Sequence, residues 1–325
     1  MAPLLDVDSL AVTLPSPRGP LPILHDVSLT VDEGELVGIA GESGCGKSLT
    51  AQTLLGLLPA GAVVSGSARY AGTELLGLDP RGWQRVRGAG IAMVFQDPSA
   101  ALHPMLTVGR QLTEHMRVHL RMDRRAAGRR AVDLLDQVRI PDPERALRAY
   151  PHQFSGGMRQ RVAIAMALAA RPRLLIADEP TTALDVTVQA GILALLDRLR
   201  AETGLAVAFI THDLGVLSAL TTRGYIFYAG RVVETGPTGA LLTAPTHPYT
   251  AALLGARPHG TRTGGTLRPI PGAPPAPGEA PPGCPFQPRC GYAEPSCGTS
   301  PPPLTPAGVD RSVACVVRPQ LEVAP

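Results

Sequence analysis

The stretch Gly41-Glu42-Ser43-Gly44-Cys45-Gly46-Lys47-Ser48 decides the fold of this chain. Its spacing, G-x-x-x-x-G-K-S, is that of a phosphate-binding loop, in which glycines let the backbone approach an anion closely. Lys47 is the only lysine among thirty lysine and arginine residues. A chain that uses arginine at every other basic position keeps a compact ammonium here, because the wide, planar guanidinium does not replace it at a crowded phosphate site.

The residues on either side of this loop predict a strand before it and a helix after it. Residues 35–40 form a short apolar run typical of a buried strand, and residues 48–55 predict a helix that begins at the loop. This order aims backbone N–H groups and the positive end of a helix dipole at an anion, although a chance glycine-rich turn is the alternative. Lys47 is expected to reach the β- and γ-phosphates of a nucleotide, and the Ser48 hydroxyl to bind Mg²⁺. The expected nucleotide contacts of the loop are Gly41, Ser43, Gly44, Cys45, Gly46, Lys47, Ser48 and Leu49.

The composition is that of a globular chain with a sizeable core. Of its 325 residues 44% are hydrophobic, and the net charge is only +3, so the charge balance gives no reason to expect a nucleic-acid partner. Acidic residues are interspersed in the arginine-dense segment 117–148, which favours a solvated helical face over a nucleic-acid patch. No apolar run approaches the roughly 18 residues of a membrane span, and no signal peptide is visible, so we expect a chain kept in the cytoplasm.

The pattern of apolar residues predicts an α/β fold. Residues 4–14 and 23–31 alternate apolar with polar side chains, which is typical of strands in an antiparallel edge. Helices are expected from Ser155 to about Ala169 and over residues 188–199. Continuous apolar runs, which predict buried strands, occupy residues 90–95, 174–177 and 205–210.

The same pattern predicts two domains. Residues 108–138 are helical and charged in pattern and separate two strand signals, which indicates a helical subdomain inserted at about residues 97–168. Beyond Arg257 the composition shifts abruptly to proline, glycine and cysteine. We therefore expect one domain over residues 1–256 and a second over residues 257–325.

Polar residues follow the predicted strands at their carboxyl ends, where α/β folds bind ligands. Asp178 is expected to hold Mg²⁺, and Glu179 to act as the general base that polarises the attacking water. Gln96 is expected to touch Mg²⁺ and this water, and His212 to contact the γ-phosphate. Taken alone, Glu179 could be a helix-start carboxylate and His212 a structural histidine, but their companions favour the catalytic interpretation.

The stretch Phe154-Ser155-Gly156-Gly157-Met158-Arg159-Gln160-Arg161 resembles the signature motif of ATP-binding cassette ATPases. The phosphate loop, Gln96, the strand before Glu179, residues 182–185 and His212 occur in the order of that family, and the resemblance covers about residues 4–255. It implies a P-loop NTPase cassette: a RecA-like core with an antiparallel β edge and an inserted helical subdomain.

The resemblance also implies how ATP is bound. In that family two cassettes dimerise head to tail, so Ser155, Gly156 and Gly157 would face the ATP of the partner cassette, and a helix N-terminus there suits an anion. Two features depart from the family pattern. Met158 replaces the commoner glutamine, and no aromatic residue stands where adenine usually stacks, near Arg18 or Leu14.

The end of the chain narrows the resemblance. Residues 246–250 and 283–290 resemble the C-terminal extension of dipeptide and oligopeptide importer ATPases, and residues 154–160 and 177–189 resemble their D-type subunit. This implies an ATPase of the translocase class that pairs with an F-type cassette, two membrane permease subunits and, indirectly, an extracytoplasmic solute-binding protein. The chain would then sit peripherally on the cytoplasmic face of the membrane.

Other functions remain open at this point. Nickel, haem-precursor and some oligosaccharide importers share the same extension, so the residues identify the transported solute less securely than they identify the ATPase activity. A soluble ABC ATPase of DNA repair or translation is the runner-up, although repair types carry long coiled-coil insertions and translation types usually carry two cassettes. An exporter subunit is disfavoured by the extension.

Four of the five cysteines lie in the extension, and Cys45 stands apart as a small packed residue. Cytosolic disulfides are rare, so a four-thiolate metal site is the sharper interpretation, with free or paired thiols as an alternative. The gaps are wider than the tight pairs of zinc sites, and they suit a [4Fe–4S] cluster, which the resemblance also implies; zinc is the second choice. We expect this site to take no part in ATP chemistry because it is distant in sequence from the phosphate-contacting motifs. Its ligands would be Cys284, Cys290, Cys297 and Cys315.

Overall fold

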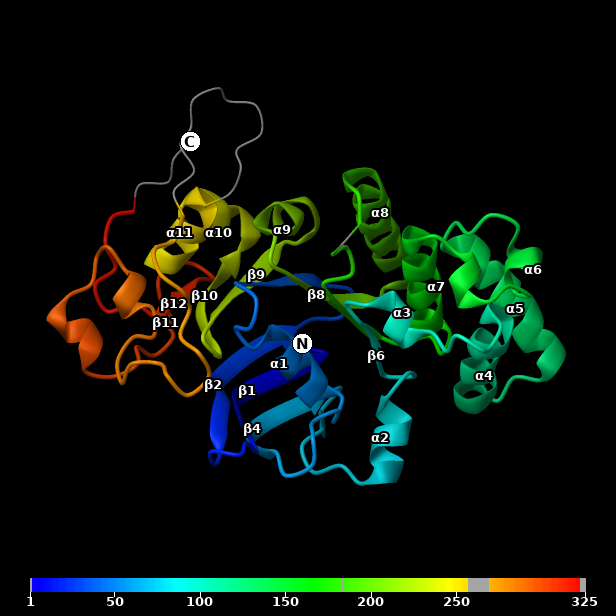
Figure 1. Ribbon diagram of the computed structural model, residues 1–325, viewed down its shortest axis with the longest axis horizontal. Helices are drawn as coiled ribbons and strands as arrows, with labels where there is room; N and C mark the ends of the chain where they lie inside the picture. Colours follow the sequence, from blue (N-terminus) through cyan, green and yellow to red (C-terminus); the bar gives the residue numbers. More distant parts are fainter. Residues whose placement is uncertain (1, 183, 257–268, 322–325) are drawn as a thin grey trace. The chain divides into compact units, whose positions relative to one another are not determined.

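The computed structural model describes residues 2–182, 184–256 and 269–321, which divide into two compact units (Figure 1). The first unit consists mainly of Gly77–Ile210, and the second contains Leu5–Thr30, Val37–Leu76 and the described residues from Thr211 onward. Ala183 of the expected family motif and the predicted domain boundary at residue 257 lie outside the described residues. The division into residues 1–256 and 257–325 therefore stays a prediction.

The first unit is built on a parallel sheet. Its strands β6 (Ile91–Val94), β7 (Leu174–Asp178) and β8 (Ala206–Thr211) lie in the order β8-β7-β6. All residues of β7 and β8 are buried, which is why these strands read as continuous apolar runs. The three strands predicted for this region are confirmed.

Helices of the first unit begin at side chains that cap them. Thr107, Asp123, Ser155 and Asp185 each accept a hydrogen bond from a backbone N–H of the first turn. Residues 97–168 contain helices α3 to α7 and no strand, as the charged helical pattern predicted. The helices are α2 (Pro80–Val86), α3 (Pro98–Ala101), α4 (Val108–Leu120), α5 (Arg124–Gln137), α6 (Pro143–Ala146), α7 (Gly156–Leu168) and α8 (Val186–Thr203), with a 3-10 turn η1 (Pro151–Gln153).

The second unit contains two sheets. The predicted antiparallel edge is a sheet in the order β2-β1-β4-β5, in which β1 pairs antiparallel with β4. In the other sheet, in the order β11-β12-β10-β9-β3, β3 pairs parallel with β9 and the remaining pairs are antiparallel. The strands are β1 (Leu5–Leu14), β2 (Leu21–Val31), β3 (Leu36–Ala40), β4 (Val63–Tyr70), β5 (Thr73–Glu74), β9 (Arg223–Tyr228), β10 (Arg231–Pro237), β11 (Thr305–Pro306) and β12 (Ser312–Val313).

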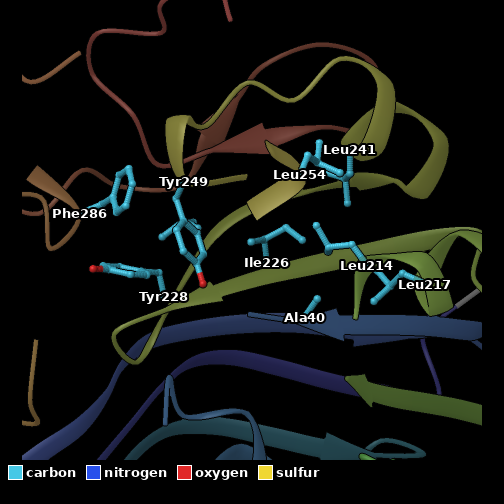
Figure 2. Packing of buried hydrophobic residues seen from close by; sticks show 10 residues of the cluster. Ala40, Leu214, Leu217, Ile226, Tyr228, Leu241, Tyr249, Leu254 and Phe286 are labelled. Atoms are coloured by element: carbon cyan, nitrogen blue, oxygen red, sulfur yellow. The ribbon is translucent and has the colours of Figure 1, made fainter. Parts of the chain in front are cut away.

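The core of this unit includes the proline-rich extension. Figure 2 shows Phe286 of the extension packed against Tyr228 of β9 and Tyr249, with ring centroids 5.3 Å from each. Phe286 is 2% exposed, so the extension completes the core here. The helices and turns of the unit are α1 (Lys47–Leu54), α9 (Leu214–Leu220), α10 (Thr238–Thr243), α11 (Pro248–Gly255), η2 (Gln287–Arg289) and η3 (Pro295–Gly298).

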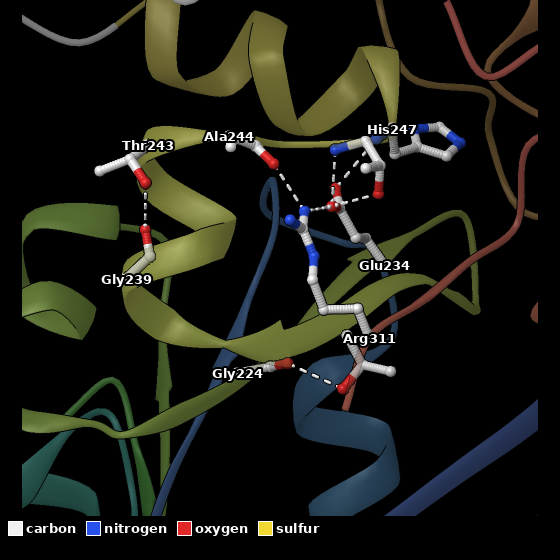
Figure 3. A network of polar contacts seen from close by, with 9 residues as sticks. Gly224, Glu234, Gly239, Thr243, Ala244, His247 and Arg311 are labelled. Carbon is white, nitrogen blue, oxygen red and sulfur yellow. Dashed lines mark hydrogen bonds and ion pairs between the residues drawn. The ribbon is translucent and has the colours of Figure 1, made fainter. Parts of the chain in front are cut away.

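A buried ion pair attaches the last strand of the extension (Figure 3). Glu234 of β10 is fully buried, and its carboxylate accepts hydrogen bonds from Thr246, from the His247 N–H and from Arg311, whose Nη2 lies 3.1 Å away. Arg311 also donates to the Ala244 carbonyl, so the buried charges are paired and hydrogen-bonded. Burial lowers the pKa of His247 to about 4, which keeps that imidazole neutral beside the pair at pH 7.

Within the part of the chain that the structure describes, every helix is too short or too polar to cross a bilayer.

Candidate nucleotide-binding site

The phosphate loop joins the end of β3 to the start of α1, as the sequence predicted. Gly41 has φ of 153°, and a Cβ there would lie 2.2 Å from the Phe227 carbonyl oxygen. Gly46 has φ of 106°, and a Cβ there would lie 2.6 Å from Leu24. At Gly41 both the left-handed backbone and the backbone oxygen exclude a side chain. At Gly46 the left-handed backbone favours glycine, and a Cβ would also displace the end of the Leu24 side chain.

Lys47 is folded back into this loop. Its side chain is buried, and Nζ donates to the carbonyl oxygens of Gly41 at 2.8 Å and Glu42 at 2.9 Å. These acceptors make burial of the ammonium tolerable, and they hold it at the centre of the loop. Burial raises the pKa of the Cys45 thiol, which agrees with its prediction as a small packed residue.

The remaining loop residues present backbone and hydroxyl groups. Ser43 and Gly44 are exposed at the tip, and Ser48 and Leu49 are half-buried in the first turn of α1. The α1 N-terminus and the glycine cradle therefore suit a phosphate group, and the Ser48 hydroxyl suits a magnesium ion beside it.

The loop is held from outside by residues that the sequence analysis missed. The Glu42 N–H donates to Tyr249 Oη at 2.9 Å, and Arg289 of the extension donates to both Glu42 carboxylate oxygens. The fold brings η2 against the phosphate loop although the two are distant in sequence. That the four-cysteine site takes no part in ATP chemistry stays a prediction. The only available signal was that Tyr249 and Arg289 lie in the two motifs quoted for the extension.

The structure brings Gln96 and Glu179 together in the first unit. Gln96 Nε2 donates to the Glu179 carboxylate at 3.2 Å, and Thr182 Oγ1 donates to the same oxygen at 2.9 Å. Glu179 has φ of 46°, and its N–H donates to the Ile210 carbonyl. A non-glycine residue held in this region costs about 1 kcal/mol or more, and such strain gathers at functional sites. Thr182 is a carboxylate partner that sequence reasoning did not assign.

Asp178 and the signature residues also lie in the first unit. Asp178 is the last residue of β7 and is 5% exposed. Ser155 caps α7 by accepting from the Met158 N–H, and Ser155 and Gly156 are exposed at this helix end. A Cβ at Gly157 would lie 2.6 Å from Val188, which explains the glycine at that position.

The predicted nucleotide contacts are divided between the two units. The phosphate loop and His212, which is exposed directly after β8, belong to the second unit. Gln96, Asp178 and Glu179 belong to the first. The magnesium set of Ser48, Gln96 and Asp178 draws on both units and stays a prediction.

The four cysteines of the extension line one cavity of about 20 Å³ in the second unit. Burial, reinforced by the neighbouring thiols, raises the pKa of Cys284 to about 11, and burial also raises that of Cys290. Cys297 is held beside Cys284 by a backbone hydrogen bond between its carbonyl and the Cys284 N–H. Four thiols are a donor set for a soft metal centre. Within residues 2–182, 184–256 and 269–321, however, no three His, Cys, Asp or Glu side chains converge closely enough to hold a metal ion.

Comparison with known proteins places this geometry in a family. Residues 24–182 match the ABC transporter family, and residues 233–297 match the C-terminal region of oligopeptide/dipeptide transporters. The dimeric ATP-binding cassette MJ0796 bound to ADP and Pi is similar, with a TM-score of 0.65 and 30% identity over 72% of this chain and 98% of that one.

Two curated relatives extend the match over most of the chain. The oligopeptide transport ATP-binding protein OppD of Salmonella typhimurium is 46% identical over 299 residues, 92% of this chain and 89% of the relative. OppD of Mycobacterium tuberculosis is 50% identical over 318 residues, 97% of this chain but 52% of the relative, so the chain spans about half the length of that protein. The chain belongs to the ABC transporter family, and the predicted α/β cassette fold is confirmed.

Replacing Lys47 with arginine should weaken nucleotide binding although the charge is kept. The buried ammonium fits between two loop carbonyls, and a planar fork in the same space displaces them. We expect at least about a tenfold rise in the MgATP Kd, or about 1.4 kcal/mol, by titration calorimetry. Replacing the exposed Arg125 on α5 with lysine is the matched control for arginine–lysine exchange. Equal affinities of wild type and Lys47→Arg would contradict the argument from the buried ammonium.

Replacing Glu179 with glutamine should leave ATP binding intact and lower turnover by about a hundredfold or more, because the amide keeps the contacts with Gln96 and Thr182 but cannot accept the proton. Phosphate release and ATP affinity, measured on the same preparation, check the two halves of this expectation. Near-normal hydrolysis would move the base to another residue.

Proposed function

We propose that this chain is the ATP-hydrolysing subunit that energises import of di- and oligopeptides through a membrane ABC transporter. The observation that carries the ATPase assignment is the phosphate loop, a glycine cradle around a buried lysine at a helix N-terminus. Peptide import is supported by the match of residues 233–297 and by the names of the relatives.

Each predicted residue then has a role in hydrolysis. The phosphate loop, with Lys47, binds the β- and γ-phosphates, and Ser48, Asp178 and Gln96 would hold Mg²⁺, which supplies charge neutralisation when bound. Glu179 accepts the proton of the attacking water, and the Gln96 amide orients the Glu179 carboxylate and this water. His212 contacts the γ-phosphate. Because Glu179 is held by two donors, its carboxylate is oriented before the substrate arrives.

The cassette acts with partners in this proposal. It pairs with a second, F-type cassette, and Ser155, Gly156 and Gly157 at the start of α7 face the ATP of that partner. Two permease subunits form the membrane path, and a solute-binding protein delivers the peptide, so this chain sits on the cytoplasmic face. Residues 97–112 follow Gln96 and carry Met105, a large apolar residue that is 76% exposed, which supports them as the contact with a permease.

We also propose that Cys284, Cys290, Cys297 and Cys315 hold a [4Fe–4S] cluster, with zinc as the second choice. Support comes from the common cavity that all four thiols line. Because the described side chains do not converge closely enough to hold a metal ion, binding would have to draw the thiols together. Bound there, the cluster would staple a segment that has little regular secondary structure of its own.

Co-expression with the candidate permease and second-cassette subunits tests the transport function. The complex in vesicles should take up labelled oligopeptides in an ATP-dependent manner, and the Glu179→Gln complex should assemble without transport. Competition with nickel and haem separates the alternatives. Uptake of nickel or haem but not of peptide would show that the transporter imports that solute instead of peptides. A chain that purifies only with soluble proteins would favour an ABC ATPase of DNA repair or translation.

Anaerobic purification of the full chain tests the cysteine site. Iron and labile sulfide should each approach about four atoms per chain, and any of the four Cys→Ser variants should lower both. Cys45→Ala is the matched control and should keep full iron. One zinc per chain would support the second choice, whereas a metal-free chain with full transport would contradict both.

A further inference from the structure

Arg289 connects the extension to the phosphate loop. Its Nη1 and Nη2 donate to the two carboxylate oxygens of Glu42 at 2.7 and 3.0 Å, a bidentate ion pair. The Arg289 side chain is 5% exposed and that of Glu42 is 25% exposed. The pair is therefore shielded from solvent far more than an ordinary surface salt bridge, and its removal should have measurable consequences.

The guanidinium is itself fixed by its surroundings. Arg289 Nε donates to the Pro271 carbonyl at 2.9 Å, and Nη1 also donates to Tyr228 Oη at 3.2 Å. The guanidinium lies over the rings of Tyr228 and Phe286, at 5.8 and 5.9 Å from their centroids. The hydrogen bonds of Arg289 to the Glu42 carboxylate and to Tyr228 raise its pKa above the usual value, so it stays charged. Its position is set by the aromatic core shown in Figure 2 rather than by Glu42 alone.

Glu42 is held from three directions. Arg289 binds its carboxylate, Tyr249 Oη accepts from its N–H, and Lys47 Nζ donates to its carbonyl. All three polar groups of Glu42 are thus engaged, by Arg289 of the extension, by Tyr249 of α11 and by Lys47 of the loop itself.

Glu42 also poses an electrostatic problem. A carboxylate in a loop that receives a triphosphate repels it, and the repulsion grows as the local dielectric falls. The guanidinium neutralises this charge with a bidentate ion pair. Without Arg289, the carboxylate is unpaired beside the anion site.

We propose that Arg289 is a positioning residue for ATP binding, which neutralises Glu42 and fixes the phosphate loop from the C-terminal extension. The extension is then part of the nucleotide-binding apparatus of its own chain. The proposal rests on the ATPase assignment above, and it does not depend on the solute, the partners or the metal.

The chain contains a matched control for this contact. Arg311 is also an extension arginine in a buried ion pair, with Glu234, but its partners are on β10 and after α10 rather than in the phosphate loop. Replacing Arg311 therefore measures the effect of weaker attachment of the extension alone. Replacing Arg289 measures that effect together with the loss of its contact with the phosphate loop.

The experiment compares full-length Arg289→Ala, Arg311→Ala, Glu42→Gln and the double variant Arg289→Ala/Glu42→Gln. We expect Arg289→Ala to raise the MgATP Kd about tenfold, or about 1.4 kcal/mol, and Arg311→Ala to leave it within about twofold. Adding Glu42→Gln should return the Kd to within about threefold of wild type, because the amide removes the unpaired charge. In steady-state hydrolysis the KM for ATP should rise with kcat nearly unchanged. Thermal unfolding of each variant shows whether both arginine variants are folded to the same extent.

Three results would overturn the proposal. Unchanged ATP affinity in Arg289→Ala shows that the loop does not need the pair. Equal losses of MgATP affinity in Arg289→Ala and Arg311→Ala would show that the Arg289–Glu42 contact only attaches the extension. Failure of Glu42→Gln to rescue excludes the electrostatic argument. If Arg289→Ala fails to fold, Arg289→Lys, which keeps the charge and loses the fork, must show an intermediate Kd that Glu42→Gln also improves. A wild-type chain that does not bind MgATP would overturn the ATPase assignment as well.

Discussion

Burial of the Lys47 ammonium is the constraint on which the nucleotide site depends. A buried cation needs acceptors, and here they are the carbonyl oxygens of Gly41 and Glu42. These carbonyls point inward because the loop adopts backbone angles that glycine allows at positions 41 and 46. Phe227 and Leu24 pack against these two glycines, in the space that a Cβ at either position would occupy. The loop therefore depends on β9 and β2 as much as on its own sequence.

The proline-rich extension is ordered by its contacts with the cassette. Segments rich in proline and glycine bury too little apolar surface to fold alone, and this one is ordered by joining an existing core. Phe286 supplies the apolar contact, β12 adds a strand beside β10, and Arg289 and Arg311 each meet a carboxylate of the cassette. Arg289 is the last residue of η2 and directly precedes Cys290. The same short turn therefore contacts the phosphate loop through Arg289 and leads into the four-cysteine cavity through Cys290.

In the first unit, strain and hydrogen bonding act together at Glu179. The left-handed backbone turns this residue out of the line of β7, while Gln96 from the end of β6 and Thr182 fix its carboxylate. A base that is oriented in advance loses little freedom when a water molecule arrives. The parallel pairing of β6 with β7 makes this possible, since it brings the ends of both strands to one edge.

The sequence by itself determined the elements and the identity of most site residues. The strand before the loop, the helix after it, the buried runs ending at Gln96 and Asp178, and the Ser155 cap are local patterns, since each depends on residues close in the chain. Such patterns cannot assign partners separated by long stretches of chain. Tertiary structure alone decided that Arg289 meets Glu42, that Tyr249 holds the same residue, and that Thr182 supports Glu179. These contacts depend on packing and on the need of buried polar groups for partners, and neither leaves a periodic mark in the sequence.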